Sequence, residues 1–349
     1  MPSRKLQLRP PLPPMEALLV PEIPQGPGWQ YEPKWDGFRC LVFRDGDDVY
    51  LQSKAERPLA RYFPEVVAAM QAVKTARFVL DGEIVVPVAG RLAFDELLQR
   101  IHPAASRIRK LSLQRPALFI AFDLLADTSG KSLLALPLRE RRPRLEAFAR
   151  RFFPAAAGIR LSPATTRLSQ ARKWFRTVGG NLDGVVAKLL DSPYRPGERT
   201  AMQKVKLVRS ADCVVGGFRY LASEKLVGSL LLGLYDSEGI LHHVGFTSNI
   251  MARERKALTR KLEKLIEPPG FTGRAPGGPS RWSTKRSSEW QPLAPKLVVE
   301  VAYDHFTAGR FRHGTRLLRW RPDKAARQCT LEQVERRASA DIRLLGLHA

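Results

Sequence analysis

The chain has 349 residues, which is long enough for two domains that each bury a core. Its hydrophobic content of 44% and charged content of 26% exclude a disordered chain. The 58 Lys and Arg residues outnumber the 34 Asp and Glu residues and give a formal net charge of +24, so nucleic acid is the first partner to expect. No apolar run approaches the roughly 20 residues of a spanning helix, and no signal sequence follows Met1, so we expect a cytoplasmic protein without a membrane partner.

The three cysteines are scattered along the chain, at Cys40, Cys213 and Cys329, with no C-x-x-C pair. Three such residues cannot build a disulfide framework or a four-cysteine zinc site. We therefore expect each of them to be a buried thiol.

The predicted elements begin after a proline-rich lead-in over residues 3–28. Residues 38–54 predict a β-hairpin, because two strand-like runs flank a turn signal, either Asp45-Gly46 or the Asp-Asp that follows. A helix is expected after Pro64, and residues 78–94 read as two strands joined by a turn near Gly90.

The chain continues with a short helix at 94–101 and a buried strand at 117–126. Residues 136–152 have helical spacing, but proline is tolerated only in the first turn. We therefore expect this helix to begin near Arg141 or to be kinked at Pro143. A further helix and two strands, at 182–190 and 201–209, follow.

Composition changes near residue 210, where short strands with glycine turns and one basic helix begin. This pattern is typical of a small β-barrel such as an oligonucleotide-binding (OB) fold. We expect an α+β protein with one domain over residues 1–207 and an OB-fold β-barrel domain with a C-terminal tail over 208–349.

The stretch Lys34-x-Asp36-Gly37-x-Arg39 places a lysine where it could act as a nucleophile. Such a lysine must lose its proton, which neighbouring cations, a metal ion or desolvation can promote. Asp81 and Glu83 are two residues apart on one predicted strand, so both point to one face.

Further charged pairs come later in the chain. Lys204 and Lys206 share a face by the same rule, and Asp183 and Lys188 lie on the strand before them. Such a face can hold a metal triphosphate and stabilise phosphoryl transfer. Each piece alone is more often a solvated strand face or a turn than a site, so the hypothesis rests on the ordered set.

In that order the chain resembles the covalent nucleotidyltransferases, and most closely the ATP-dependent DNA ligases. The resemblance rests on the sequence motifs EPKWDGFR, SK at 53–54, LDGEIV, FIAFDLL, LDGVVAK, QKVK and RWRPDK. It covers the chain from about Pro14 to Lys324. YRPGER and RHGTRLLRWRPDK are most similar to the stand-alone bacterial ligases of type C and to the ligase module of type D end-joining enzymes. The resemblance implies an antiparallel-sheet nucleotidyltransferase (adenylation) domain, ATP-grasp-like, followed by the OB-fold domain.

The resemblance also implies a role for each matching residue. Lys34 would attack the α-phosphorus of ATP and form a lysyl–AMP phosphoramidate. The implied ATP-binding residues are Glu32, Arg39, Glu83, Phe122, Lys188, Arg199, Lys204, Lys206, Arg321 and Lys324, with Asp323 beside the last two. The implied metal ligands for Mg or Mn are Asp36, Glu83 and Asp183, and the implied DNA contacts are Ser53 and Lys54.

Within that set, Glu32 would lie at the adenine edge and Phe122 would stack on the base. Arg39 and Glu83 would hold the ribose side, and Lys188 and Arg199 would touch phosphate. Lys204 and Lys206 would neutralise the α-phosphate, and the 321–324 segment would orient the leaving pyrophosphate.

Two positions depart from the family pattern. Asp183 stands where glutamate is usual, which shortens the carboxylate by one methylene. Lys54 stands where arginine is usual, and it cannot make a bidentate contact to phosphate.

The implied function is sealing of nicks in double-stranded DNA by a monomer that uses ATP and a divalent metal, in DNA repair or recombination. Two alternatives stay open: an RNA ligase or capping-type nucleotidyltransferase, and a non-catalytic nucleic-acid-binding protein. An NAD-dependent ligase is disfavoured, because three scattered cysteines cannot form that family's zinc finger.

Overall fold

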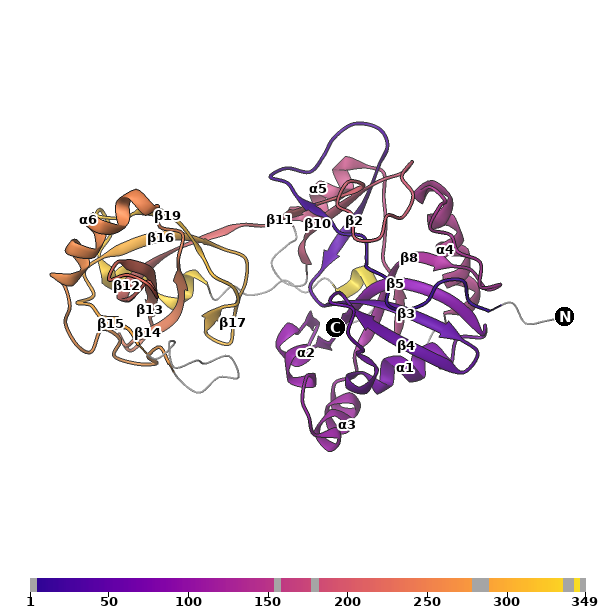
Figure 1. The fold of residues 1–349 in the computed structure, drawn as a ribbon, viewed down its shortest axis with the longest axis horizontal. Coiled ribbons are helices and arrows are strands. Elements are labelled where there is room, and N and C mark those ends of the chain that lie inside the picture. Colours follow the sequence, from indigo (N-terminus) through magenta and orange to yellow (C-terminus); the bar gives the residue numbers. More distant parts are fainter. Residues whose placement is uncertain (1–4, 154–157, 177–181, 278–288, 335–341, 346–349) are drawn as a thin grey trace. The chain divides into compact units, whose positions relative to one another are not determined.

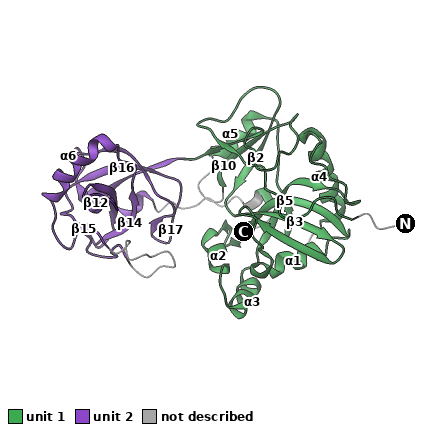
Figure 2. Ribbon diagram, viewed as in Figure 1, with its two compact units in different colours: residues 1–207, 338–349 green, residues 208–337 purple. Residues whose placement is uncertain are grey.

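The computed structural model describes residues 5–153, 158–176, 182–277, 289–334 and 342–345. The chain divides into two compact units, one of residues 1–207 with 338–349 and one of residues 208–337 (Figure 2). The sequence predicts a C-terminal tail that belongs to the second domain, whereas Ile342–Leu345 groups with the first unit. Apolar packing explains this grouping, because Leu345 is buried in one hydrophobic cluster with Tyr31 and Trp174.

The first unit contains a four-stranded and a five-stranded sheet (Figure 1). The first sheet has the order β1 (Leu18–Leu19), β11 (Met202–Lys206), β10 (Leu182–Leu189) and β2 (Trp29–Trp35). The second has the order β4 (Asp48–Ser53), β3 (Phe38–Asp45), β5 (Arg77–Val85), β8 (Leu118–Ala126) and β9 (Ile159–Leu161). A small hairpin, β6 (Pro87–Val88) and β7 (Arg91–Leu92), turns at the predicted Gly90.

Alternation along β2 and β10 gives their sheet two chemically different faces. Tyr31, Val185 and Ala187 pack with Trp174 in a buried apolar cluster, and helix α5 (Leu168–Arg176) lies against both strands. The charged residues at alternate positions therefore point away from α5. The sequence predicts that this helix ends at Gly179-Gly180, which lie outside the described part of the chain.

Two helices pack on the five-stranded sheet: α1 (Pro64–Gln71) on β4 and α4 (Leu138–Phe152) on β8. Helices α2 (Phe94–Arg100) and α3 (Ala105–Gln114) follow β7 in the chain, and α3 contacts α1. Helix α4 begins at Leu138 rather than near Arg141, and Pro143 lies inside it. A buried ion pair holds its first turn, with Arg141 Nε 2.9 Å from Asp123 Oδ1.

Gly37 joins the two sheets, because it lies between β2 and β3. A Cβ atom at this position would overlap the carbonyl oxygen of Ile84 and lie 2.8 Å from Cγ of Glu83. The glycine of the Lys-x-Asp-Gly pattern thus lets the chain pass directly against β5.

The second unit is one curled antiparallel sheet with a helix. Its strands are ordered β14 (Leu241–Thr247), β13 (Val227–Tyr235), β12 (Arg209–Tyr220), β16 (Val298–Tyr303) and β19 (Arg316–Trp320), and β15 (Gln291–Pro292) also pairs with β12. Helix α6 (Ala252–Glu263) and the hairpin β17 (Phe306–Thr307) and β18 (Arg310–Phe311) complete it. The end of β14 meets the residue before β19 in a single bridge, Thr247 to Thr315. Within the described residues the ladder goes no further, so the expected barrel is only partly closed.

None of the described helices combines the length and apolar character needed to cross a membrane.

His243 is a buried histidine in the second unit. Neither ring nitrogen has a hydrogen-bond partner among the described residues, and the ring packs edge-on against Phe271. Burial, together with the positive charges of Arg310 and Arg219, lowers the pKa of His243 from 6.5 to about 4.

Replacing His243 by phenylalanine should therefore flatten the acid side of the stability profile. The unfolded chain binds a proton near pH 6.5 while the folded chain does so only near pH 4, so wild-type stability falls as pH drops through that window. The loss should be on the order of 3 kcal/mol. Urea unfolding at several pH values between 4 and 7 measures it, and parallel profiles for the two proteins would contradict the prediction.

Candidate active site

A cavity of about 180 Å³ lies in the first unit and is lined from both sheets and from the segment Pro14–Ala17. Eight of the predicted site residues line it: Glu32, Lys34, Arg39, Lys54, Glu83, Phe122, Lys188 and Lys204. Seven others are not among its lining residues: Asp36, Ser53, Asp183, Arg199, Lys206, Arg321 and Lys324.

Strand register brings the predicted lysines together. Lys34 on β2 is paired with Gly184 on β10, which is paired in turn with Lys206 on β11. One step along, Val186 on β10 is paired with both Glu32 and Lys204. Because cross-strand partners share a face, Lys34, Lys204 and Lys206 point to the same side of the sheet.

Asp183 lies between two of these lysines. Its Oδ2 atom forms a short ion pair with Lys34 Nζ and is 3.3 Å from Lys206 Nζ. The carboxylate is almost fully buried, and it sits at a register irregularity beside Gly184. The structure thus gives Lys34 a hydrogen-bond partner that can receive its proton.

Positive charge is concentrated at the end of the cavity that Lys34, Lys54 and Lys204 line. Burial, then the charges of Lys34, Lys54 and Lys206, lower the pKa of Lys204. A group of cations this close together is a site for a polyanion such as a triphosphate.

A buried ion pair lies at the other end of the cavity. Lys188 Nζ is 2.8 Å and 2.9 Å from the two carboxylate oxygens of Glu32, and 4.7 Å from the ring centroid of Phe122. Glu32 is 2% exposed and Lys188 3%. The resemblance implies that Lys188 contacts phosphate, whereas in the structure its ammonium lies against the carboxylate of Glu32, the residue expected at the adenine edge.

Replacing Lys188 by methionine should destabilise the first unit by about 3 kcal/mol, because it leaves the Glu32 carboxylate buried without its cation. Adding Glu32→Gln to that variant should restore most of the loss, since the unpaired charge is then removed. Denaturant unfolding of the three proteins measures both effects. A double variant no more stable than Lys188→Met alone would contradict this explanation.

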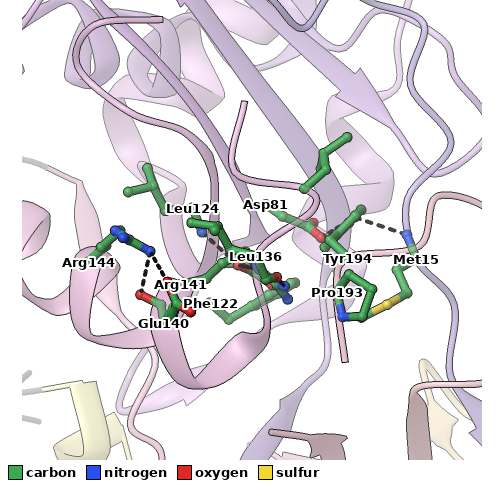
Figure 3. A network of polar contacts seen from close by, with 12 residues as sticks. Met15, Asp81, Phe122, Leu124, Leu136, Glu140, Arg141, Arg144, Pro193 and Tyr194 are labelled. Atoms are coloured by element: carbon green, nitrogen blue, oxygen red, sulfur yellow. Dashed lines mark hydrogen bonds and ion pairs between the residues drawn. The ribbon is translucent and has the colours of Figure 1, made fainter. Parts of the chain in front are cut away.

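Arg39 belongs to a buried network that the sequence did not predict. Its guanidinium lies 4.6 Å from the Phe122 ring centroid and makes two bonds of 2.6 Å to the carboxylate of Asp81. The Tyr194 hydroxyl also donates to Asp81, at 2.7 Å, and accepts from the backbone N–H of Met15 at 3.0 Å (Figure 3). The network ties the N-terminal segment to the wall of the cavity.

Glu83 is the cross-strand neighbour of Arg39 and lines the same cavity. Burial raises the pKa of Glu83 to about 7, against the opposing charges of Lys34 and Arg39, and the nearby Asp36 raises it further. A cation arriving beside this carboxylate would favour its ionised form.

The carboxylates of this site could hold a metal ion only together with a bound phosphate group. Across the described ranges, no three His, Cys, Asp or Glu side chains form a cluster that could hold a metal ion. Mg²⁺ is commonly held by one or two carboxylates together with substrate phosphates. Glu83 and Asp183, beside a cationic cavity, match that arrangement when a triphosphate is bound.

Of the two predicted DNA contacts, Lys54 lines the cavity, whereas its neighbour Ser53 does not. The Ser53 hydroxyl accepts from the backbone N–H of Arg57 at 2.9 Å, so it stabilises the turn after β4. Lys54 Nζ is 3.2 Å from a carboxylate oxygen of Glu16, and Arg199 pairs with the same carboxylate. Glu16 was not among the predicted site residues.

A separate cluster lies in the second unit around the nearly buried Asp212, which the sequence did not predict. Arg321 Nη1 is 2.9 Å and Lys324 Nζ 2.7 Å from its carboxylate. Arg321 also pairs with Asp323, and hydrogen bonds from Arg321 lower the pKa of Asp323 to about 2. Asp212 on β12 thus holds the side chains of Arg321 and Lys324, which follow β19.

Comparison with protein families gives two matches. Residues 16–206 match a family described as "ATP dependent DNA ligase domain". Residues 223–324 match one described as "ATP dependent DNA ligase C terminal region".

The chain is also similar to curated proteins along nearly its whole length. It is 45% identical to DNA ligase C2 of Mycolicibacterium smegmatis, covering 95% of this chain and 96% of that protein. It is 43% identical to DNA ligase C of Mycobacterium tuberculosis, with 95% and 96% covered. A protein of Mycobacterium tuberculosis named as a multifunctional non-homologous end joining DNA repair protein is 29% identical over 85% of this chain and 36% of its own length.

Solved structures give a likeness in fold. A structure of a Lig E DNA ligase superposes with a TM-score of 0.53 at 16% identity, over 88% of this chain and 100% of that chain. This likeness supports the α+β fold class expected from the sequence, a nucleotidyltransferase domain followed by an OB-fold domain.

Proposed function

The chain belongs to the ATP-dependent DNA ligases, and we propose that Lys34 is the residue through which it carries AMP from ATP to DNA. The enzymatic activity implied by the sequence resemblance, ATP-dependent DNA ligation, is that of the family. The observation that supports Lys34 is its position: it lines the cavity, pairs with Asp183, and shares a strand face with Lys204 and Lys206.

In the first step the Lys34 ammonium gives up a proton through Asp183, and its nitrogen attacks the α-phosphorus of ATP. A phosphorus–nitrogen bond forms, the α–β phosphoanhydride bond breaks, and pyrophosphate leaves. Lys204 and Lys206 lie where they neutralise the charge that develops on the α-phosphate.

In the second step an oxygen of the 5′-phosphate of the nick attacks the same phosphorus, and the Lys34 amine leaves. In the third step the 3′-hydroxyl attacks the DNA phosphate and AMP leaves. The product is a continuous phosphodiester strand, and the enzyme regains its free lysine.

For the nucleotide, we assign the base to the end of the cavity with Phe122 and the Glu32–Lys188 pair, and the phosphates to the lysine end. Arg39 and Glu83, from β3 and β5, line the same cavity from the second sheet, and we assign them to the ribose. A bound Mg²⁺ or Mn²⁺ would supply charge neutralisation on the triphosphate, and Glu83 and Asp183 are the carboxylates that would hold it, with Asp36 nearby.

The finer assignment is a cytoplasmic monomer that seals nicks with a 5′-phosphate and a 3′-hydroxyl in double-stranded DNA during repair. The charge of +24 supports DNA as the polyanion. The relative named for end joining supports a repair role, and the monomer rests on the sequence resemblance alone.

The test is incubation with ATP labelled on its α-phosphate, followed by addition of nicked duplex DNA. We expect an acid-labile adduct on the protein, transfer of label to the 5′-end and then a sealed strand, with little labelling from GTP. Equal labelling from GTP would favour the capping-type alternative, and sealing only of RNA nicks would favour an RNA ligase. DNA binding without any adduct would favour the non-catalytic alternative.

A further inference from the structure

Glu16 is an acidic residue that lines the cavity near the lysines Lys34, Lys54 and Lys204. Its Oε2 atom accepts from Arg199 Nη2 at 2.6 Å and from Nε at 2.8 Å, and its Oε1 atom is 3.2 Å from Lys54 Nζ. An arginine fork with an adjacent ammonium is the donor set that binds a phosphate oxyanion. Here a carboxylate of the protein itself fills that donor set.

The backbone fixes where the Glu16 carboxylate lies. The N–H of Glu16 donates to the carbonyl of Glu198 at 2.9 Å, which attaches it to the loop that carries Arg199. Next to it, the carbonyl of Met15 accepts from Arg39 at 3.3 Å. Since these contacts do not involve the Glu16 side chain, its carboxylate can leave Arg199 and Lys54 without unfolding the segment.

The two cations are open to solvent, as an incoming ligand requires. Arg199 is 64% exposed and Lys54 59% exposed, while the Glu16 side chain is 24% exposed. Partial burial opposes ionisation, but hydrogen bonds from Arg199 and Lys54 hold the pKa of Glu16 below its ordinary value, so it is an anion at neutral pH. Exposed ion pairs are weak, so an anion of higher charge can displace this one.

We propose that Glu16 is an internal substitute for a substrate phosphate: it occupies Arg199 and Lys54 in the resting enzyme and yields them to a phosphate group when substrate binds. This inference rests on the proposed function, because ATP and the 5′-end of a nick are the phosphate-bearing substrates. Glu16 then determines specificity, since only a ligand with a terminal phosphate recovers the contacts that displacement of the carboxylate breaks.

The test compares Glu16→Gln with Glu198→Gln. The first variant keeps the shape of the side chain and removes the competing charge. The second removes the same charge at the residue directly before Arg199, where Glu198 contacts Thr200 at 3.1 Å and Arg195 at 4.0 Å. Any general gain in DNA affinity from one fewer negative charge should appear equally in both variants.

Dissociation constants are measured by fluorescence anisotropy in EDTA, for nicked duplexes with either a 5′-phosphate or a 5′-hydroxyl. Glu16→Gln should bind the 5′-phosphate nick about three- to tenfold more tightly than Glu198→Gln does, with no such gain for the 5′-hydroxyl nick. In a second arm, the KM for ATP is measured in self-adenylation. A gain confined to ATP would identify the triphosphate as the displacing group, and would also support the proposal.

If Glu16→Gln matches Glu198→Gln in both arms, or binds phosphate more weakly than wild type, the proposal is overturned. Equal thermal unfolding of the two variants establishes that both are folded. The binding arm needs no catalysis, so its failure is distinct from failure of the proposed function, which would appear as no adduct on the wild-type protein.

Discussion

Lys34→Ala should form no detectable AMP adduct and should seal nicks at least about 10³-fold more slowly than wild type, because the nucleophile is gone. Lys34→Arg should fail equally, since a guanidinium keeps the charge beside Asp183 but is not a nucleophile at neutral pH. Gel analysis of protein labelled by α-labelled ATP measures the adduct.

Two comparisons make the Lys34 result specific. Lys110→Ala removes an exposed lysine on α3 and should label as wild type does. A nick that already carries AMP bypasses the lysine, so Lys34→Ala should seal it with a much smaller loss. An adduct that persists in Lys34→Ala would show that another residue is the nucleophile.

Replacing both Arg321 and Lys324 by alanine should slow self-adenylation by about 10²- to 10³-fold, the range expected when charge stabilisation of a transferring phosphoryl group is removed. Sealing of a pre-adenylylated nick should fall less than about tenfold, because no pyrophosphate leaves in that step. Single-turnover assays of the two steps measure the difference, and equal losses in both would contradict a step-specific role.

A folding defect has to be separated from that effect, because the double variant leaves Asp212 without either of the two cations that pair with it. Adding Asp212→Asn removes the carboxylate charge that has lost both cations, and it should restore most of the lost stability. Adenylation should stay slow in this triple variant. If it recovers together with stability, the cluster is structural.

The sequence was informative where short-range alternation determines position. The face shared by Lys204 and Lys206 and the pair Asp81 and Glu83 follow from a period of two, and the structure places them on β11 and β5 as expected. The hairpin with its turn after Asp45 follows equally from local turn chemistry. The α+β class and the ligase resemblance are confirmed as well.

The contacts that the sequence did not reveal join residues far apart in the chain. Tyr194 lies 113 residues from Asp81, and Met15 lies 179 residues from Tyr194. Lys188 reaches Glu32 diagonally across the β2–β10 register, which cannot be read before the strands are paired. Helix α3 was not predicted, although its Ile108 and Leu111 lie at helical spacing. Helix α4 begins earlier than expected because a buried ion pair holds the turn before Pro143.

The most direct test of the account isolates the labelled protein free of ATP and locates the AMP by peptide mass spectrometry. We predict that AMP lies on the peptide that contains Lys34, and that adding a stoichiometric amount of nicked duplex moves it to the DNA and then releases it as the strand is sealed. AMP on Lys204, Lys206 or any other residue, or an adduct on Lys34 that nicked DNA does not discharge, would contradict the account.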